Sequence, residues 1–486
     1  MLPELHDLGA AIAAQARQRP TAVALVHDDT DVTYGELLER AEKARLHLAG
    51  LHLAPGEPVS VPAQKTPGTV ATVLACLLTG RPFLLPSTAL PDEVVGQLNA
   101  VAGCRAVEQV DAAARPGADA PAAQPPPGTS FMLTTSGSTG LPKVVPLTGT
   151  AVARFASWAA STFDIGVDTT VLNYAPLNFD LCLLDIWTTL AYGGRVVLVD
   201  PERAANGRYL ANLLRRHPPQ VVQAVPFFYG LLDEAVDAHF DSVRHVMVTG
   251  DAVSERVLAA LPGLFPAARR WNIYGCTETN DSFVHEFGDD AAVPVPIGHP
   301  LPGVDALVVG LDDTVLDGPG VGELWVHTPF QTTGYLTPGH ADRFGERPGG
   351  ADGRRWFRTG DLVSRDPDGT LTVVGRSDFQ VKIRGFAVNT AEIERVLLEH
   401  PEVVEAAAVA LPDPVTGHRL AAAVRRAPGS RLNSLTLRKH CARRLPQAAI
   451  PSTLRIGEQP LPRTSTGKVD RSAVGRLFEQ AEGRTP

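Results

Sequence analysis

The sequence predicts an α/β protein in which a large N-terminal domain of layered sheets is followed by a small α+β domain. Between residues 145 and 274, short apolar runs alternate with helix-like segments, which is typical of a largely parallel sheet covered by helices on both faces. After residue 375 the order changes to one helix, two strand-like runs and a second helix, so this part is expected to form a separate lobe. A length of 486 residues also exceeds what a single core usually sustains.

The N-terminal part combines helices with short strands. Thr33 and Glu36 have the spacing of a capping box, so a helix is expected over residues 36–48. Residues 111–128 are rich in Ala and Pro and are predicted to form an exposed loop, because proline neither continues a helix nor donates to a sheet. Apolar spacing predicts helices over residues 5–18 and 70–78 and strands over residues 22–26 and 81–86.

The alternating part supplies the predicted parallel sheet. Its strands are expected over residues 194–199, 220–225, 243–248 and 270–273, with helices over residues 209–216 and 228–238. Ligand sites in such sheets lie beyond the carboxyl ends of the strands. Thr249, Gly250 and Asp251 fall at one such end, and Tyr274 and Gly275 fall at another.

The remaining elements divide into two groups. Residues 306–309, 323–326 and 370–374 are predicted strands separated by Gly, Pro and Asp turns, which indicates an antiparallel, barrel-like part of the large domain. In the C-terminal lobe we expect helices over residues 390–400 and 435–444, and strands over residues 403–411 and 419–424.

The composition favours a soluble, cytoplasmic protein that binds neither nucleic acid nor membranes. Forty-four basic and 53 acidic residues give a net charge of −9, and a net negative charge does not favour binding to nucleic acid or anionic lipid. The N-terminus lacks a basic region followed by an apolar core, and no apolar window approaches the length of a membrane span. The cysteines are odd in number, lack Cys-x-x-Cys spacing and are expected to be reduced thiols. They are Cys76, Cys104, Cys182, Cys276 and Cys441.

Residues 134–143 have the chemistry of a polyphosphate cradle. They read Thr-Thr-Ser-Gly-Ser-Thr-Gly-Leu-Pro-Lys, so two glycines permit tight turns, five hydroxyls supply donors and Lys143 supplies a positive charge. The segment is not a Walker loop, because Lys143 follows Pro142 rather than a glycine. A flexible Ser/Gly/Thr linker has the same composition.

Three later motifs give this loop a context. They are Asn-Ile-Tyr-Gly-Cys-Thr-Glu at residues 272–278, Phe-Arg-Thr-Gly-Asp at 357–361 and Pro-Arg-Thr-Ser-Thr-Gly-Lys at 462–468. With the loop, and in this order, they resemble the core motifs of the adenylate-forming superfamily, and most closely those of the stand-alone amino-acid adenylation enzymes of nonribosomal peptide pathways. The resemblance runs from about Val32 to Arg471, nearly the whole chain.

The resemblance implies a site for ATP with Mg²⁺. Ser136, Ser138, Thr139 and Lys143 are implied to hold the β- and γ-phosphates, and Glu278 is implied to lie on the magnesium side. The full implied nucleotide set is Thr135, Ser136, Gly137, Ser138, Thr139, Gly140, Lys143, Asn272, Tyr274, Gly275, Asp361 and Arg376.

Individual roles follow from the same resemblance. Tyr274 is implied to stack on adenine with Asn272 at its polar edge, and Asp361 to accept hydrogen bonds from the ribose hydroxyls with Arg376 nearby. The catalytic residues are implied to be Lys468, Thr277 at the α-phosphate, and Glu278. Lys468 stands in a Thr-Ser-Thr-Gly turn, where its compact cation could bridge the substrate carboxylate and the α-phosphate.

The resemblance further implies a mobile C-terminal domain and a second half-reaction. Asp378 occupies the hinge position, which divides the chain into a core domain over residues 1–377 and a lid over residues 378–486. Movement of the lid would withdraw Lys468 and bring residues 384–386 toward a thiol arm. Since only eighteen residues follow Lys468, we expect the acceptor to be a stand-alone peptidyl or acyl carrier protein.

Asp180 indicates the class of acid. It matches the aspartate that pairs with the ammonium group in amino-acid-activating members, and a buried carboxylate favours a cationic partner. By the same alignment the substrate pocket comprises Asp180, Leu181, Leu184, Ala224, Met247, Thr249, Gly250, Ile273, Asp281 and Ser282. The pair Leu181 and Leu184 resembles prolyl-activating enzymes, whereas Asp281 would suit a second amino group. The substrate could therefore be a proline-like amino acid, a small amino acid, a β-amino acid or a diamino acid.

Several positions depart from the family pattern. Cys276 replaces a proline, Val144 a glycine and Gly149 a histidine, and residues 328–330 lack a usual glycine. None of these changes removes a charged catalytic group. An organic-acid–coenzyme A ligase and a catalytically silent carrier-binding module are the alternatives to an amino acid–carrier protein ligase.

Overall fold

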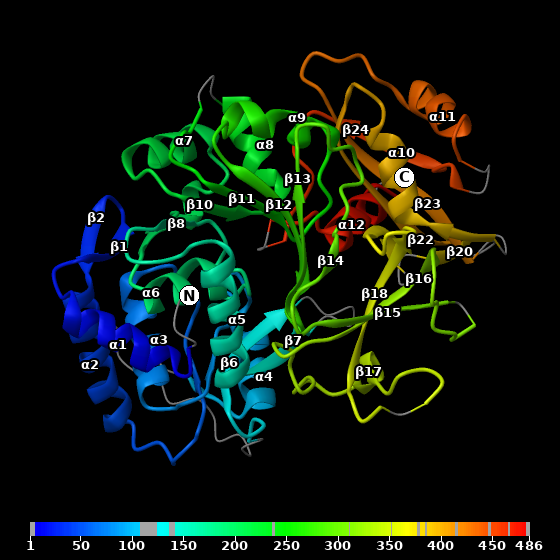
Figure 1. Ribbon diagram of the computed structural model, residues 1–486. Helices are drawn as coiled ribbons and strands as arrows, with labels where there is room; N and C mark the ends of the chain where they lie inside the picture. Colours follow the sequence, from blue (N-terminus) through cyan, green and yellow to red (C-terminus); the bar gives the residue numbers. More distant parts are fainter. Residues whose placement is uncertain are drawn as a thin grey trace. The chain divides into compact units, whose positions relative to one another are not determined.

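The structure is a computed structural model of the chain (Figure 1). It describes residues 5–106, 124–135, 141–235, 239–310, 312–350, 352–376, 380–383, 386–413, 417–445, 449–464 and 467–482. By its internal contacts the chain divides into two compact units. Unit 1 comprises Met1–Ala306 and Trp325–Arg358, and unit 2 comprises Leu307–Leu324 and Thr359–Pro486.

A nine-stranded sheet forms the centre of unit 1. In spatial order its strands are β14 (His299–Pro300), β13 (Asn280–Phe287), β12 (Arg269–Cys276), β11 (His245–Thr249), β10 (Val221–Ala224), β8 (Thr170–Asn173), β9 (Arg195–Leu198), β1 (Val23–His27) and β2 (Thr30–Thr33). The run from β12 to β1 is parallel. At one end β2 pairs antiparallel with β1, and at the other β13 pairs antiparallel with β12 and β14 antiparallel with β13. The predicted parallel sheet is therefore confirmed.

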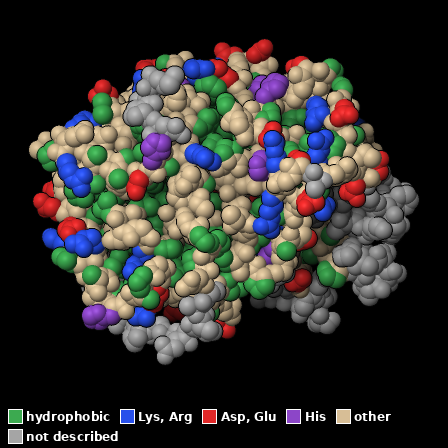
Figure 2. All heavy atoms as spheres, turned by 60° about the horizontal axis from the view of Figure 1, so that its bottom comes forward, with side chains coloured by type: hydrophobic (Ala, Val, Ile, Leu, Met, Phe, Trp, Pro, Cys, Tyr) green, Lys and Arg blue, Asp and Glu red, His purple; other side chains and the backbone are tan. Residues whose placement is uncertain are grey.

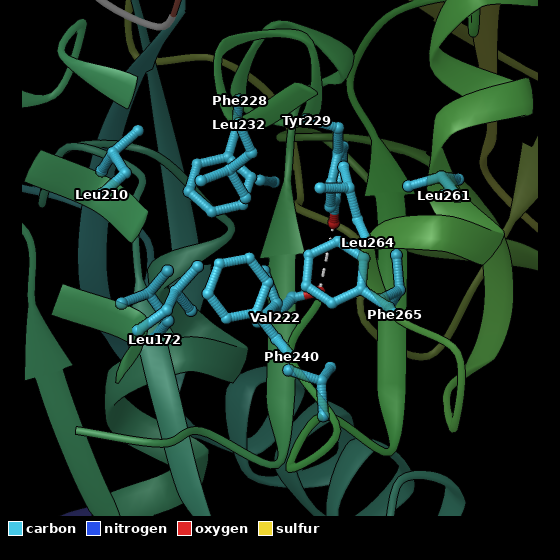
Figure 3. Close-up of a cluster of buried hydrophobic side chains, with 14 of the residues drawn as sticks. Leu172, Leu210, Val222, Phe228, Tyr229, Leu232, Phe240, Leu261, Leu264 and Phe265 are labelled. Carbon is cyan, nitrogen blue, oxygen red and sulfur yellow. Dashed lines mark hydrogen bonds between the residues drawn. The ribbon is translucent and has the colours of Figure 1, made fainter. Parts of the chain in front are cut away.

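Three helices cover one face of this sheet. They are α7 (Gly207–Arg216), α8 (Pro226–Ala235) and α9 (Glu255–Leu264), which pack with alternate residues of β10 and β11 into one apolar core. In Figure 3, Tyr229 lies in this core with its hydroxyl directed at the Val222 carbonyl, to which it donates at 3.3 Å. The hydroxyl also donates to the Met247 carbonyl at 2.8 Å, so a buried polar group is satisfied by the strands.

The opposite face carries an unusual helix. After β8 the chain turns into η1 (Leu183–Thr188), a fully buried π-helix that continues into α6 (Thr189–Ala191). The η1 segment packs against β8 and against α5 (Gly149–Thr162). Because π-helical turns widen the backbone, they are often found at functional sites.

A second sheet of unit 1 contains the predicted phosphate loop. Its strands are, in order, β5 (Arg105–Ala106), β3 (Val59–Ser60), β4 (Phe83–Leu84), β6 (Thr129–Thr135) and β7 (Lys143–Thr148). The first four strands are parallel, and β7 returns antiparallel to β6.

Three of the remaining helices match the predicted ones closely, whereas two others were not predicted. The α2 helix (Tyr34–Gly50) begins with the predicted capping box, because Thr33 Oγ1 accepts from the Glu36 amide and Glu36 accepts from the Thr33 amide. The other two that match are α1 (Leu8–Gln18) and α3 (Pro67–Leu78), and the two that were not predicted are α4 (Asp92–Ala102) and the short η2 (Pro201–Arg203).

The predicted barrel-like part is a five-stranded sheet. It contains β15 (Asp305–Val309), β16 (Gly320–His327), β18 (Trp356–Arg365) and β17 (Phe344–Gly345) in that order, with β19 (Leu371–Arg376) paired to β18. Short η3 (Ala341–Arg343) precedes β17. The pairs that β18 forms with β17 and β19 are antiparallel, as expected.

The C-terminal part of unit 2 is an α+β fold with a core on each face of its sheet. The sheet consists of β22 (Val403–Asp413), β23 (Gly417–Arg426) and β24 (Thr453–Gly457). One core includes residues of α10 (Thr390–Leu398) and α11 (Ser434–Ala442), and the other includes residues of α12 (Arg471–Glu482). The hairpin of β20 (Gln380–Ile383) and β21 (Phe386–Asn389) comes before α10.

The predicted fold class is confirmed, since the chain is a mixed α/β protein with several sheets and a small C-terminal α+β part. One detail differs: β12 continues through Tyr274 and Gly275 to Cys276, because it pairs with β13, so these residues lie within the strand rather than beyond it. The domain boundary at residue 378 stays a prediction, and most of the predicted loop over residues 111–128 lies outside the described residues.

Two observations concern the surface and the predicted absence of membrane segments. No helix in the described ranges has both the length and the apolar character that crossing a bilayer requires. On the face shown in Figure 2, acidic and basic side chains both occur among hydrophobic and uncharged ones.

Candidate active site

The predicted phosphate loop connects two paired strands. Thr135, the last residue of β6, and Lys143, the first residue of β7, are partners in the antiparallel register. Ser136, Gly137, Ser138, Thr139 and Gly140 lie outside the described residues. The hairpin therefore fixes both ends of the loop, and it places Lys143 at the start of a strand with its side chain only 14% exposed.

The second predicted motif forms the turn between β12 and β13. Cys276 and Asn280 are partners across the hairpin, so Thr277 and Glu278 lie in its tight connection rather than at the start of a helix. Gly275 is required here, since a Cβ atom would lie 2.2 Å from the Asn280 carbonyl oxygen. Both Thr277 and Glu278 are buried.

The structure brings Glu278 and Lys143 together and adds a third residue. Lys143 Nζ lies 4.0 Å from Glu278 Oε1. The Tyr335 hydroxyl donates to the same carboxylate oxygen at 2.6 Å, and Lys143 Nζ lies 4.9 Å from the centre of the Tyr335 ring. We call these three residues the lysine–glutamate cluster. Sequence reasoning missed Tyr335, and no local pattern marks it, because its contact with Glu278 spans 57 residues of sequence.

The two predicted adenine contacts have different surroundings. Tyr274 is half-buried, with its ring 5.7 Å from that of Phe283. Asn272 is buried, and its side-chain amide nitrogen donates to the carbonyl oxygens of Val295 and Pro296 at 3.1 and 2.8 Å. Its donors are therefore engaged within the protein, so its Oδ1 atom is the one available to a ligand.

Asp180 lies in the turn that leads into η1. Leu181 follows it in the same turn, and Leu184 lies in the first turn of the π-helix. Both leucines are buried, whereas Asp180 is half-buried. The local conformation thus places one carboxylate beside two apolar pocket candidates.

Strand alternation divides the other pocket candidates between two faces. Met247 and Thr249 share a face of β11, and Ile273 is the register partner of Thr249. Ala224 is the partner of Val248 and packs with it in the core below α7, α8 and α9, so it lies on the other face. Gly250 follows β11 with a φ angle of 82°, a conformation that favours glycine.

Gln223, and not the predicted Ala224, shares the face of the sheet on which Met247 lies. It is the register partner of Met247 and of Asn173 on the neighbouring strands, so the three side chains lie on one face. Because Gln223 stands one position before the aligned residue, only the observed register identifies it.

The beginning of β13 contributes a second acidic side chain. Asp281 and Ser282 are both buried there. Burial and the nearby Asp180 carboxylate raise the pKa of Asp281 to about 7. The Asp281 carboxylate forms no hydrogen bond or ion pair within the described part of the chain.

A further carboxylate lies in η1. Burial, together with the charge of Asp281, raises the pKa of Asp185 well above its ordinary value, although the Asn173 amide donates to Asp185 Oδ2 at 3.0 Å. Lys65 is buried nearby and donates to the carbonyl oxygens of Asn173 and Tyr174 at 3.3 and 2.9 Å. Burial lowers the pKa of Lys65 to about 8.

Several buried atoms in this region have no hydrogen-bond partner among the described residues. They are Asn173 Oδ1, Asp185 Oδ1, Gln223 Oε1 and Gln223 Nε2. We call Asn173, Asp180, Asp185, Gln223 and Asp281 the carboxylate region. Buried polar atoms without partners usually indicate bound water or a ligand.

In unit 2 the predicted ribose residues are paired. Asp361 on β18 and Arg376 on β19 are register partners, and Arg376 Nη1 donates to Asp361 Oδ1 at 2.8 Å. The backbone before Asp361 is fixed as well, because Gly360 has a φ angle of 75° and its amide donates to Glu323 Oε1 at 3.1 Å. The arginine thus holds the carboxylate in one orientation.

Lys468 lies in a tight turn of unit 2. Arg463 and Val469 form an isolated antiparallel bridge, and the Thr464 amide donates to the Lys468 carbonyl at 2.8 Å. Gly467 has a φ angle of 84°. Within the described residues the Lys468 ammonium has no ion-pair partner. The predicted hinge residue Asp378, like residues 384 and 385, lies outside the described residues.

The described side chains form no metal site by themselves. Among the residues that the structure describes, no three His, Cys, Asp or Glu side chains gather closely enough to hold an ion. A magnesium ion here would need ligands from the nucleotide and water, which is how Mg²⁺ is commonly bound beside one or two carboxylates. The single carboxylate of Glu278, next to Lys143, fits that arrangement.

This fold is shared with solved adenylate-forming enzymes. The structure of Klebsiella oxytoca NpsA in complex with 3-hydroxyanthranilyl-AMSN superimposes with a TM-score of 0.79, covers 98% of this chain and 100% of that chain, and is 24% identical in sequence. A likeness at this level of identity concerns the fold alone.

Sequence comparison defines the family. The family model described as AMP-binding enzyme matches residues 12–125 and 106–336, and that of the AMP-binding enzyme C-terminal domain matches residues 392–468. The chain belongs to the family of AMP-binding enzymes, as its motifs predicted.

Two relatives lie closer in sequence than NpsA. Phenyloxazoline synthase MbtB of Mycobacterium tuberculosis is 32% identical over 499 residues, which cover 98% of this chain and 34% of that protein. An L-proline–[L-prolyl-carrier protein] ligase of Streptomyces coelicolor is 35% identical over 366 residues, which cover 72% of this chain and 66% of that protein. The chain thus spans about a third of the length of the first relative.

Proposed function

We propose that this chain is an ATP-dependent amino acid ligase that forms an aminoacyl-adenylate and loads a separate carrier protein. In the first step a carboxylate oxygen of the amino acid bonds to the α-phosphorus of ATP, and pyrophosphate leaves. In the second step the phosphopantetheine thiolate bonds to the acyl carbon, and AMP leaves. Family membership and the relative named as a prolyl-carrier protein ligase support this proposal.

The carboxylate region is the observation that supports an amino acid as the substrate. Asp180 and Asp281 lie close enough for the Asp180 charge to raise the pKa of Asp281, and Asp281 and Leu181, which follows Asp180 in the chain, are both buried. An ammonium group bound between them would lower the mutual repulsion of two acidic side chains in an apolar setting. A substrate amine is therefore the natural ligand, with Leu184, Met247, Thr249, Ile273 and Ser282 as further pocket candidates.

The lysine–glutamate cluster supports a triphosphate beside this pocket. Lys143 would neutralise charge on the β- and γ-phosphates, and Glu278 would hold Mg²⁺. The ion supplies charge neutralisation at the phosphate oxygens. Thr277, in the same turn as Glu278, is proposed to donate to the α-phosphate.

The other roles are proposed from the family motifs. Tyr274 would offer its ring to adenine, with Asn272 Oδ1 and the backbone of Gly275 at the polar edge. Asp361, oriented by Arg376, would accept hydrogen bonds from the ribose hydroxyls. Lys468 would stabilise the charge that develops on the α-phosphate when the adenylate forms.

The proposal is tested by pyrophosphate exchange with a panel of amino acids and matched acids that lack the amine. We expect exchange only with amino acids, and we expect Asp180→Ala to raise KM for the amino acid far more than KM for ATP. Equal loss of both would contradict the pairing of Asp180 with the amine. Preferential use of an amine-free acid, with thioester formation on free coenzyme A, would identify an organic-acid ligase instead.

Carrier loading tests the two-domain part of the proposal. If Asp378 is the hinge of a mobile C-terminal domain, Asp378→Pro should leave pyrophosphate exchange near the wild-type rate and abolish transfer to a phosphopantetheinylated carrier protein. Loss of both steps together would argue against a hinge at this residue. An unchanged rate of loading would also exclude it.

A further inference from the structure

An irregular segment after β16, residues 328–337, contacts the two elements of unit 1 that carry Lys143 and Glu278. These elements are β7 and the turn between β12 and β13. Three threonines in it are almost fully buried, with exposures of 2% for Thr328, 1% for Thr332 and 7% for Thr337. Buried hydroxyl groups need partners, and those of Thr332 and Thr337 find them on β7, whereas that of Thr328 accepts from the Phe330 amide within the segment. The same segment is one of the places where the sequence departs from the family pattern.

One set of contacts attaches the segment to β7. The Thr332 hydroxyl donates to the Pro146 carbonyl at 2.6 Å, and the Leu336 amide donates to the Val144 carbonyl at 3.0 Å. The Val144 amide donates in return to Thr337 Oγ1 at 2.9 Å. Because Val144 follows Lys143 directly, these bonds fix the segment beside the lysine.

A second set attaches the segment to the turn between β12 and β13. The Thr332 amide donates to the Glu278 carbonyl at 2.8 Å, and the Asn280 side-chain amide donates to the Phe330 carbonyl at 3.0 Å. Thr332 therefore bonds to both elements, through its amide on one side and its hydroxyl on the other. The segment joins the strand that begins with Lys143 to the turn that carries Glu278.

Tyr335 is placed by this segment against both charged groups. Its hydroxyl donates to Glu278 Oε1 at 2.6 Å, the length of a strong bond to a carboxylate, and its ring faces Lys143 Nζ at 4.9 Å. Lys143 Nζ and Glu278 Oε1 remain 4.0 Å apart, which exceeds a direct hydrogen bond. Tyr335 thus gives the Glu278 carboxylate a hydrogen bond and the Lys143 ammonium a cation–π contact, while the two charged groups form no direct hydrogen bond with each other.

We propose that Tyr335 is a positioning residue that keeps Lys143 and Glu278 apart and oriented, so that both charges stay available to a bound magnesium–triphosphate. The inference rests on the proposed function, since the ligand is the nucleotide of that site. Without the phenolic donor, Glu278 can turn to Lys143 and form a direct pair. That pair would have to break before either group could engage phosphate or metal.

Packing alone does not account for Tyr335. Its ring also lies 5.7 Å from the Phe344 ring and 5.5 Å from the His340 ring, and a phenylalanine would keep these contacts. The hydroxyl is what reaches Glu278. Burial and the Glu278 charge keep the pKa of Tyr335 above its ordinary value, so the hydroxyl retains its proton and remains a donor.

The test is Tyr335→Phe in the full-length protein, with the affinity for ATP measured by titration calorimetry at several Mg²⁺ concentrations. We expect about tenfold weaker binding of magnesium–ATP and a higher Mg²⁺ requirement, with KM for the amino acid unchanged. The matched control is Tyr34→Phe, which removes a buried hydroxyl that donates to the Leu190 and Gly194 carbonyls. It should lower thermal stability without changing nucleotide affinity.

A double-mutant cycle separates positioning from packing. If Tyr335 acts through Glu278, then Tyr335→Phe should have little further effect on ATP affinity in a Glu278→Gln background. Additive losses, or wild-type affinity and Mg²⁺ dependence in Tyr335→Phe, would overturn the inference while leaving the proposed function intact. Failure of the wild-type protein to bind ATP at all would instead overturn the proposed function.

Discussion

The lysine–glutamate cluster and the carboxylate region both belong to unit 1, but they are built in opposite ways. In the first, Tyr335 contacts both charged groups, and threonine hydroxyls hold the surrounding backbone. In the second, atoms of Asn173, Asp185 and Gln223 lack hydrogen-bond partners among the described residues, and the Asp281 carboxylate has no cation there.

The difference lies in how the polar groups are partnered within the described residues: Glu278 and Lys143 both contact Tyr335, whereas several atoms of the carboxylate region have no partner there. A polyphosphate carries the same charges whatever acid is activated, so its binding groups can be oriented in advance by fixed partners. A pocket for a cationic ligand gains specificity when its polar groups are left unsatisfied until that ligand binds, since a ligand without matching groups then binds poorly. Four substitutions, two in each group of residues or its support, test this contrast.

The largest effect is expected for Lys143→Ala. Removing the cation should reduce ATP-dependent pyrophosphate exchange by about 10²–10³-fold, because a preorganised charge at the phosphates is lost. Lys143→Arg, which keeps the charge but alters its geometry, should lose less. A rate near wild type in Lys143→Ala would mean that the cluster does not serve the nucleotide.

The next prediction concerns the pH dependence of stability in the carboxylate region. Because the pKa of Asp281 is raised to about 7, the folded protein retains a proton there that the unfolded chain has released, so stability falls as pH rises from about 4 to 7. Asp281→Asn stays neutral and should avoid this loss. Above pH 7 the variant should therefore be more stable than wild type by about 2 kcal/mol, with a much smaller difference near pH 4.

Chemical denaturation of both proteins across this pH range would measure the effect. Glu286→Gln provides a control, since Arg269 lowers the pKa of Glu286 and its removal should not produce a stabilisation above pH 7. An Asp281→Asn variant that is equally or less stable than wild type at pH 8 would show that this carboxylate has a partner in solution.

A smaller effect is expected for Thr332→Val in the segment that supports the lysine–glutamate cluster. The change removes the hydroxyl that donates to the Pro146 carbonyl and accepts from the Gly334 amide, so the buried Pro146 residue loses this donor. We expect a loss of about 1–2 kcal/mol in the free energy of unfolding. Thr332→Ser, which keeps the hydroxyl, should lose less.

The smallest effect is expected for Gln223→Met in the carboxylate region. The substitution keeps the volume and removes two polar atoms that have no partner among the described residues, so the free energy of unfolding should stay within about 1 kcal/mol of wild type or rise. A clear destabilisation would show that Gln223 bonds to buried water, and the proposed contrast would then be weaker.

Prediction from sequence succeeded where the signal is local. The capping box of Thr33 and Glu36 and the helix–strand alternation between residues 145 and 274 depend on neighbouring residues or on short patterns. It was less accurate where strand register matters. Ala224 packs into the core on the opposite face from Met247, and Gln223 shares that residue's face, because a shift of one position in a strand reverses the side on which a side chain lies.

The α/β class, the family of AMP-binding enzymes and the order of the motifs could all be predicted from the chain, because periodicity and motif spacing are properties of short stretches of residues. Which distant residues complete the site depends on the folded protein. Tyr335 reaches Glu278 across 57 residues, and Thr337 bonds to Val144 across 193. Such contacts exist only after the sheets have packed, since packing alone brings these separate segments within bonding distance.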